Sequence, residues 1–211
     1  MTVMTPCVLS EEVLDKIMLL FWEHGYFNTS IHDLMTTTGF NRTAIYKHFG
    51  GKHGLFLAML QRFRGKVVVE ATAPLSDPER GMEGIKSFFL QFIQCDLESM
   101  ASHGCFMIAT AANLPTDEPA VVGMIDDFLS HLRALFYKNL RWQQAEHLLD
   151  ADFNTEATAD FLVGNVIGLM TLLRSAADPH MIANHVHGIT TYLATLPARK
   201  ISPHGNLHLI S

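Results

Sequence analysis

The chain has 211 residues, 48% of them hydrophobic and 17% charged, with a formal net charge of −6, so it can fold around a large core and does not have the composition of a disordered protein. The three cysteines, Cys7, Cys95 and Cys105, have no CxxC spacing, which fits a reducing compartment and predicts neither a disulfide framework nor a zinc site. No apolar run is expected to be long enough to cross a bilayer and no secretory signal is visible, so we expect a cytoplasmic protein without a membrane partner.

Helix signals follow one another closely in the first third of the chain. Side-chain oxygens at Ser10, at Thr29-Ser30 and at Asn41 can accept hydrogen bonds from the free N–H groups of a first helical turn. Gly39 can take the left-handed conformation that ends a helix. Apolar residues recur at helical spacing between these signals. We therefore expect four helices, at residues 11–25, 30–39, 41–49 and 52–71.

From residue 74 onward the pattern remains helical, without strand signals or repeats. Proline-containing breaks at 73–78 and 114–119 and the pair Asp178-Pro179 separate five further helices. We expect these helices at about 78–101, 105–113, 119–142, 154–177 and 178–196. The fold class is therefore all-α, with an N-terminal domain at 1–52, a connecting helix at 53–73, a body at 74–197 and a mobile tail at 198–211.

The third expected helix divides its side chains between two faces. Ile45 and Phe49 lie four residues apart and are expected to point into the core. The outward face is small, hydrogen-bonding and partly cationic, and it carries Arg42, Thr43, Ala44, Tyr46, Lys47 and His48. Short side chains let a helix approach the DNA major groove, where donors reach base edges and phosphates. The two short helices therefore predict a helix-turn-helix, and the alternative is a solvated polar face on an ordinary helical protein.

This region resembles a known family. The N-terminal DNA-binding domain of the TetR family of transcriptional regulators is similar to residues 13–60, in Thr29-Ser30, in the run GFNRTAIYKHF at 39–49 and in Lys52. The resemblance implies base-edge contacts from Arg42, Thr43 and Ala44, and phosphate contacts from Thr29, Tyr46, Lys47, His48 and Lys52. Arg42 is the best candidate for reading guanine, because its guanidinium can bond O6 and N7 together. Tyr46 can instead be a packing residue between the short helices.

The charge distribution leaves an alternative function open. Residues 1–70 hold seven Lys or Arg and six Asp or Glu, whereas the rest of the chain holds eight and 15. A mostly acidic protein with its few cations near one helix can bind DNA, but with a modest electrostatic contribution. The basic arm that often precedes the first helix in the family is missing. The alternative is a helical small-molecule-binding protein or enzyme whose N-terminal domain no longer reads DNA.

The last two expected helices are candidates for a dimer interface. Residues 161–173 are apolar or small nearly all round, which predicts a helix buried on every side. The resemblance implies that these helices from two subunits form a four-helix homodimer interface, with Phe161, Gly164, Ile167, Gly168, Val186, Ile189, Tyr192 and Leu193. A two-fold dimer would read a near-palindromic operator. Burial within a single subunit is the alternative explanation of the same pattern.

An effector pocket is expected among the helices of the body. Its candidate residues are mostly apolar with a few polar groups, a mixture that suits a small, largely apolar effector, and the alternative is a core rich in Phe and Met. They are Phe88, Phe92, Cys95, Cys105, Met107, Thr110, Asn113, Phe128, His131, Trp142 and Met170. Cys105 stands at an expected helix start, where a thiol pKa can be lowered, and the run around it resembles some electrophile- or oxidant-responsive TetR proteins. It is either a sensing thiol or a packed small hydrophobic residue.

The histidines and the remaining polar residues predict no metal, no cofactor and no catalytic residue. His185 and His187 are two residues apart and do not share a helix face, and His204 and His208 lie in the expected tail. His103 beside Cys105 lacks the third orienting group of a Cys–His nucleophile. We therefore expect a ligand-responsive DNA-binding regulator, most simply a repressor, and not an enzyme.

Overall fold

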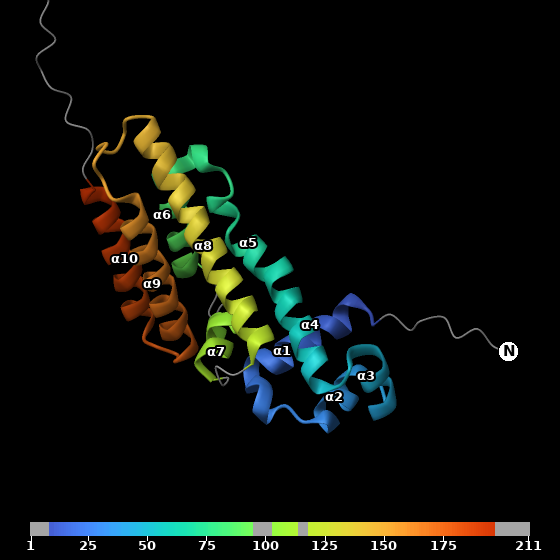
Figure 1. The fold of residues 1–211 in the computed structure, drawn as a ribbon. Helices are drawn as coiled ribbons and strands as arrows, with labels where there is room; N and C mark the ends of the chain where they lie inside the picture. The colour runs from blue at the N-terminus through green and yellow to red at the C-terminus, as the bar shows by residue number, and fades with distance from the viewer. Residues whose placement is uncertain (1–8, 95–102, 114–117, 197–211) are drawn as a thin grey trace, which may run out of the picture.

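The computed structural model describes residues 9–94, 103–113 and 118–196, and all regular secondary structure in these ranges is helical (Figure 1). The predictions for Cys7, for Cys95 and for the tail lie outside the described ranges. Three helices form the N-terminal domain, called the head below: α1 (Glu11–Asn28), α2 (Ile31–Thr38) and α3 (Arg42–Phe49). The expected all-α class is confirmed for the described residues.

Local hydrogen bonds explain where the helices of the head begin. Asp33 and Ser30 form a capping box, in which the Ser30 hydroxyl accepts from the Asp33 N–H and the Asp33 carboxylate accepts from the Ser30 N–H. The Asn41 side chain accepts from the Ala44 N–H at 2.9 Å. Gly25 has φ 75° and interrupts α1, so the regular helix ends there as expected, and one more helical turn follows to Asn28. These caps fix the two short helices independently of the body.

A continuous helical rod leads from the head to the body. It consists of α4 (Lys52–Phe63), a π-helical segment at Arg64–Val68 and α5 (Val69–Ala71). Arg62 pairs with Asp15 at 2.7 Å and with Glu11 at 2.6 Å. These ion pairs fasten the rod to α1. The expected single helix at 52–71 is thus confirmed in extent, whereas its π-helical turn was not anticipated.

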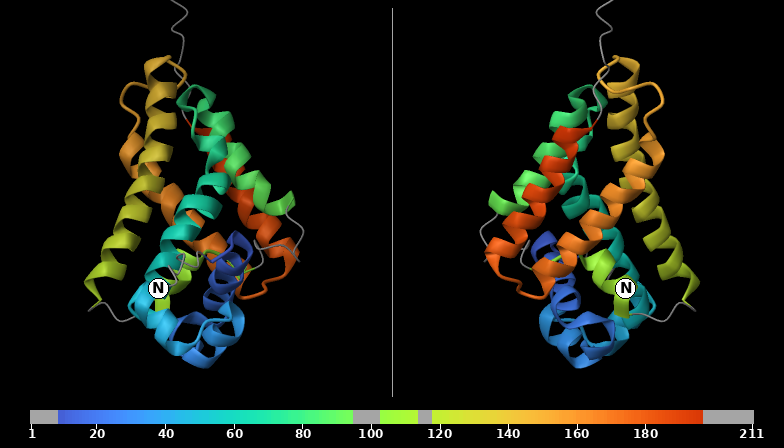
Figure 2. Two further views of the ribbon diagram at one scale, coloured as in Figure 1. Left: turned by 90° about the vertical axis from the view of Figure 1, so that its right-hand side faces the viewer. Right: turned by 90° about the vertical axis from the view of Figure 1, so that its left-hand side faces the viewer.

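The body contains α6 (Gly81–Gln94), α7 (Phe106–Asn113), α8 (Pro119–Ala145), α9 (Thr155–Arg174) and α10 (Pro179–Thr195). The four long helices run side by side away from the head, and the short α7 lies at the junction with it (Figure 1). Viewed at right angles, the head forms one end of the molecule, and α6 and α8 lie close together at the opposite end and spread apart toward the head (Figure 2). Helix α6 is described only to Gln94, so the rest of its expected extent to 101 is not tested. The cavity described below lies within this arrangement.

Helix α9 corrects one expectation. By length and composition it could cross a membrane, so the expectation that no apolar run reaches that length was wrong. In the subunit it packs against α8 and α10, and only 39% of its most apolar window is buried. Length and apolarity do not distinguish a membrane helix from a helix at a subunit interface. The prediction of burial on every side is therefore not met within one subunit, because an apolar face of α9 remains open.

Candidate nucleic-acid interface and effector cavity

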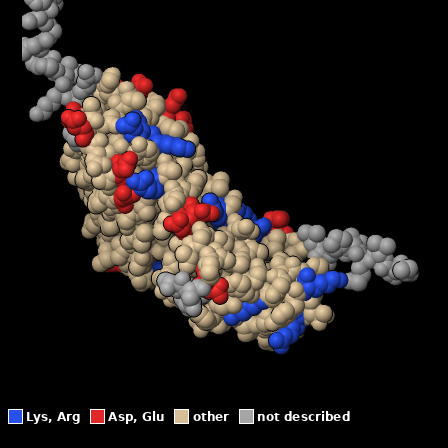
Figure 3. All heavy atoms as spheres, viewed as in Figure 1, with Lys and Arg blue, Asp and Glu red and all other residues tan. Residues whose placement is uncertain are grey.

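The polar face of α3 lies at the surface of the head. Ile45 is fully buried and Phe49 is half-buried, as expected, and they anchor the helix in the head. Arg42, Thr43, Tyr46, Lys47 and His48 are exposed and Ala44 is half-buried. Figure 3 shows blue side chains over the end of the molecule that holds α2 and α3, whereas most red ones lie along the body. Donors and positive charge thus lie together on one short helix.

Tyr46 both packs and faces solvent. Its ring lies against Gly51, where a Cβ would stand 3.1 Å from the ring, and 49% of the residue is exposed. The guanidinium carbon of Arg42 lies 5.6 Å from the ring centroid, one helical turn earlier. A cation over an aromatic ring is held by the negative face of that ring. Tyr46 therefore contacts Arg42 while about half of its own surface stays exposed.

Two of the residues predicted to contact phosphate have other contacts in the structure. Thr29 is fully buried, and its hydroxyl donates to the Gly25 carbonyl at 2.8 Å, so its side chain does not reach the surface. The helix cap is Ser30 instead. The Lys52 ammonium lies 4.3 Å from the Tyr26 ring centroid, and partial burial lowers its pKa. Thr29 is thus removed from the interface, whereas Lys52 remains a candidate at the first position of α4.

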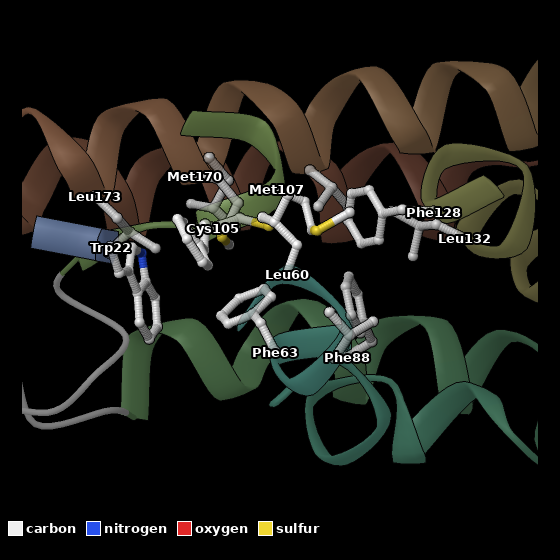
Figure 4. Close-up of a cluster of buried hydrophobic side chains, with 14 of the residues drawn as sticks. Trp22, Leu60, Phe63, Phe88, Cys105, Met107, Phe128, Leu132, Met170 and Leu173 are labelled. Carbon is white, nitrogen blue, oxygen red and sulfur yellow. The ribbon is translucent and has the colours of Figure 1, made fainter. Parts of the chain in front are cut away.

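A cavity of about 440 Å³ lies where the head, the rod and the body meet. Most of its wall is apolar, and aromatic rings come from α1, α4, α6 and α8. Figure 4 shows Trp22 at one end of the buried cluster, Phe63 and Cys105 beside it in the middle, and Phe128 and Leu132 at the other end. The described lining residues are Trp22, Phe63, Val67, Val68, Glu70, Ala71, Thr72, Phe88, Gln91, Phe92, Gly104, Cys105, Phe128, Leu132, Val166 and Met170. This composition suits a small, largely apolar ligand.

The structure brings together only part of the expected pocket. The predicted residues that do line the cavity are Phe88, Phe92, Cys105, Phe128 and Met170. Met107 is fully buried in the core, Thr110 and Asn113 border a separate small cleft beside α1, and His131 is exposed. Trp142 lies near the end of α8 and is not among the described lining residues, and Cys95 is outside the described ranges. Met107, Thr110, Asn113, His131 and Trp142 are not among the described residues that line this cavity, because helical periodicity does not reveal which side chains border a space.

The largest omission from the sequence prediction is Trp22. It lies four residues after Met18 on the apolar stripe of α1, so its burial could have been found from the sequence. Its position in a cavity wall depends on how the head packs against the body. Arg174 of α9 donates to the Trp22 carbonyl at 3.2 Å and to the His103 carbonyl at 3.3 Å. The His103 ring also pairs with Glu23 at 3.3 Å, so this side of the head is fastened to the body.

The expected activation of Cys105 is not met. Burial raises the pKa of its thiol to about 11, although the Ile108 and Met107 backbone N–H groups oppose the shift. A thiol with a raised pKa is a poor nucleophile at neutral pH. Cys105 therefore fits the alternative of a packed small hydrophobic residue, here in the wall of the cavity.

The expected dimer residues divide into two groups. Val186, Ile189 and Leu193 are buried inside the subunit, where α10 packs on α6 and α9, so they are not available to a partner. Phe161 is 48% exposed, and its ring packs at a tilt against the Tyr192 ring with centroids 4.9 Å apart. The accessible predicted residues are Phe161, Gly164, Ile167, Gly168 and Tyr192, and Met181 of α10 is also exposed.

Comparisons with known proteins agree with this architecture. A family model described as bacterial regulatory proteins of the tetR family matches residues 13–59, and one described as a tetracyclin repressor-like C-terminal domain matches residues 81–189. The HTH-type transcriptional repressor ComR of Escherichia coli is 28% identical over 169 residues, or 80% of each chain. The repressor AcnR of Corynebacterium glutamicum is 35% identical over 84 residues, which cover 36% of this chain and 45% of that protein.

Solved structures show the same fold. A TetR regulator from Chloroflexus aurantiacus superposes with a TM-score of 0.78 at 21% identity, covering 88% of this chain and 94% of its own. A cysteine mutant of the TetR-family regulator CifR, complexed with 26bp operator DNA, gives 0.76 at 20% identity and covers 89% and 98%. Since the C-terminal family model alone spans more than half of the residues and the N-terminal model covers the helix-turn-helix, the chain belongs to the TetR family of bacterial regulatory proteins.

Proposed function

We propose that the protein is a homodimeric transcriptional repressor that binds a near-palindromic operator and releases it when a small, largely apolar effector occupies the cavity. The observation that carries the proposal is the exposed polar face of α3, supported from behind by Ile45 and capped by Asn41. Such a face, on a short helix at the end of the molecule, can enter the major groove. Its work would be done in the cytoplasm.

Arg42, Thr43 and Ala44 lie at the start of α3 and are proposed to read base edges. Tyr46, Lys47, His48 and Lys52 are proposed to bind phosphates, which position a protein on DNA without specifying sequence. The operator complex of CifR and the repressor names of ComR and AcnR support DNA binding and repression. The operator sequence and the effector are proposed to be specific to this protein, because its identity to these relatives is low.

The dimer is proposed to form through the open apolar face of α9 and the neighbouring surface of α10. Phe161, Gly164 and Tyr192 would lie in the interface, and the small Gly164 permits close approach of two helices. A two-fold axis would place two copies of α3 about 34–36 Å apart, one turn of DNA. An isolated monomer would present only one reading helix.

Release by an effector requires that the effector binds the two states of the dimer unequally. The cavity wall includes Trp22 of the head and Val67, Val68 and Ala71 of the rod, as well as residues of the body. A ligand among these groups can favour one placement of the head relative to the body. No covalent chemistry is needed for such a switch.

The test is a fluorescence-anisotropy titration of the full chain against DNA from upstream of its own coding region, with unrelated DNA as competitor. Competitor-resistant binding by two subunits per site is the expected result. If this DNA fails, selection from random duplexes separates a wrong operator from a head that does not read DNA. Failure of that selection would favour the alternative of a small-molecule-binding protein, for which the cavity is the supporting observation.

A further inference from the structure

The indole nitrogen of Trp22 is a buried donor without an acceptor. Trp22 is 1% exposed, and its Nε1 has no hydrogen-bond partner in the described part of the chain. Buried N–H groups are nearly always paired, since leaving one unpaired costs about 1–3 kcal/mol. The ring is also held firmly, with Phe63 edge-on at 4.9 Å and Phe106 stacked at 6.5 Å between centroids. This donor is therefore closely packed, buried and unpaired in the described part of the chain.

Two spaces border Trp22, and only one can hold an organic molecule. The cleft that it shares with Gly25 and Thr110 has a volume of about 20 Å³, which is room for a single water at most. The cavity that it shares with Phe63, Phe88 and Met170 has about 440 Å³. The indole nitrogen has almost no accessible surface in this structure, so an acceptor reaches it only if the ring or its neighbours shift, and only the larger cavity has room for a molecule that carries that acceptor.

The charges around the cavity select against anions. Its described lining includes no Lys, Arg or His, and the one ionisable carboxylate, Glu70, is exposed. The Gln91 amide nitrogen already donates to the Ala71 carbonyl at 2.9 Å and to the Phe88 carbonyl at 2.8 Å. The Thr72 hydroxyl donates to the Val68 carbonyl at 2.8 Å. An anion would find no cation in this wall and would approach Glu70, so a neutral molecule fits best.

We propose that the effector is an uncharged, largely aromatic or aliphatic molecule with a carbonyl-type acceptor, and that this acceptor binds the Nε1–H of Trp22. The effector would then contact the first helix of the head directly. This assignment adds a chemical class of effector to the proposed function. It rests on that function only for the effect of the effector on DNA binding, because binding at Trp22 can be measured without DNA.

The test uses two probes of the same shape, 2-acetylnaphthalene and 2-isopropenylnaphthalene, which differ in a C=O against a C=CH₂ group. The chain has two tryptophans, so the ¹H–¹⁵N spectrum has two indole signals, and Trp142→Phe assigns them. We expect the ketone to move the Trp22 indole proton downfield and to bind about tenfold more tightly by calorimetry than the alkene. The alkene should enter the cavity without the downfield shift.

Trp22→Phe removes the donor and keeps a ring, and it should bring the two affinities to within about twofold. The spectrum of the unaltered protein decides the question even if this variant does not fold. Equal affinities and equal shifts for the two probes in the unaltered protein would overturn the proposal. So would tighter binding of 2-naphthylmethylammonium that is lost in Glu70→Gln, since the cavity would then select cations. A failure here with operator binding intact would leave the DNA-binding proposal untouched.

Discussion

Arg42 is exposed in the first turn of α3 and lies over the Tyr46 ring. We expect Arg42→Ala to weaken operator binding by about 1–3 kcal/mol and to relax the preference at one base pair, because a bidentate contact to guanine is lost. Anisotropy titrations against single-base operator variants measure both effects. Lys138→Ala, which removes an exposed cation from α8, is the matched control and should change neither. An Arg42→Ala protein with reduced affinity but unchanged base preferences would place Arg42 on a phosphate.

Cys105 should react slowly for a thiol. With a pKa of about 11, its thiolate fraction at pH 8 is about a hundredfold below that of a thiol with the ordinary value of 9. We expect iodoacetamide to label Cys105 at least that much faster in urea than in the folded protein, and labelling of the folded protein to rise with pH toward 11. Mass spectrometry of the Cys105 peptide measures both rates. Equal labelling rates in the folded and unfolded chains would instead support the alternative that Cys105 is a sensing thiol.

The residues of the candidate site differ in how far the sequence could predict them. Arg42, Thr43 and Lys47 were predicted as exposed because Ile45 and Phe49 fix the phase of α3. Thr29 was misplaced because a hydroxyl can bond either to DNA or back to a carbonyl four residues earlier, and the sequence does not choose between them. Met107 and Trp22 are both buried, yet only Trp22 borders the cavity, which depends on packing between segments distant in sequence.

At the scale of elements, helix ends were predictable where a cap is local. Ser30 and Asn41 accept bonds from residues three positions ahead, and Asp178 from the N–H two positions ahead. The break at Gly25 was also visible, because glycine favours positive φ. The π-helical turn at Arg64–Val68 was not, since its apolar spacing differs little from that of an α-helix.

Gly104 precedes α7 and lies where the chain packs closely against α9. It has φ 70°, and an added Cβ would lie 2.5 Å from the Met170 carbonyl oxygen and 3.0 Å from the Arg174 Cβ. We expect Gly104→Ala to lower the free energy of unfolding by about 2–3 kcal/mol, because both the backbone and the contact are strained. Urea unfolding followed by circular dichroism measures it.

The control for this substitution is Gly123→Ala. Gly123 is exposed in α8 with no atom within 4 Å of an added Cβ, so alanine should be neutral or stabilising by up to about 1 kcal/mol. Equal stability of the two variants would show that the contact between Gly104 and Met170 opens at little cost.

At the scale of the whole molecule, the open face of α9 is the test of assembly. We expect Phe161→Asp to convert the protein to a monomer, because a carboxylate would be buried without a partner in the proposed interface. Light scattering after size-exclusion chromatography measures the mass, and anisotropy should show that tight operator binding is lost with it. Val122→Asp places the same charge at another exposed apolar position, on α8, and should remain dimeric. If both variants remain dimeric, the dimer interface does not lie on this face of α9.

The π-helical turn between head and body has a geometric consequence of its own. A π turn holds one residue more than the α turn that it interrupts, as though a residue had been inserted into a regular helix. Because the extra residue is absorbed within this turn, deleting Gly65 would give an unbroken α-helix whose two halves keep nearly the same orientation about the rod. Val67 and Val68 would still face the cavity. One residue deleted from the regular helix α4, which has no extra residue to lose, would instead turn the head by roughly 100° relative to the body.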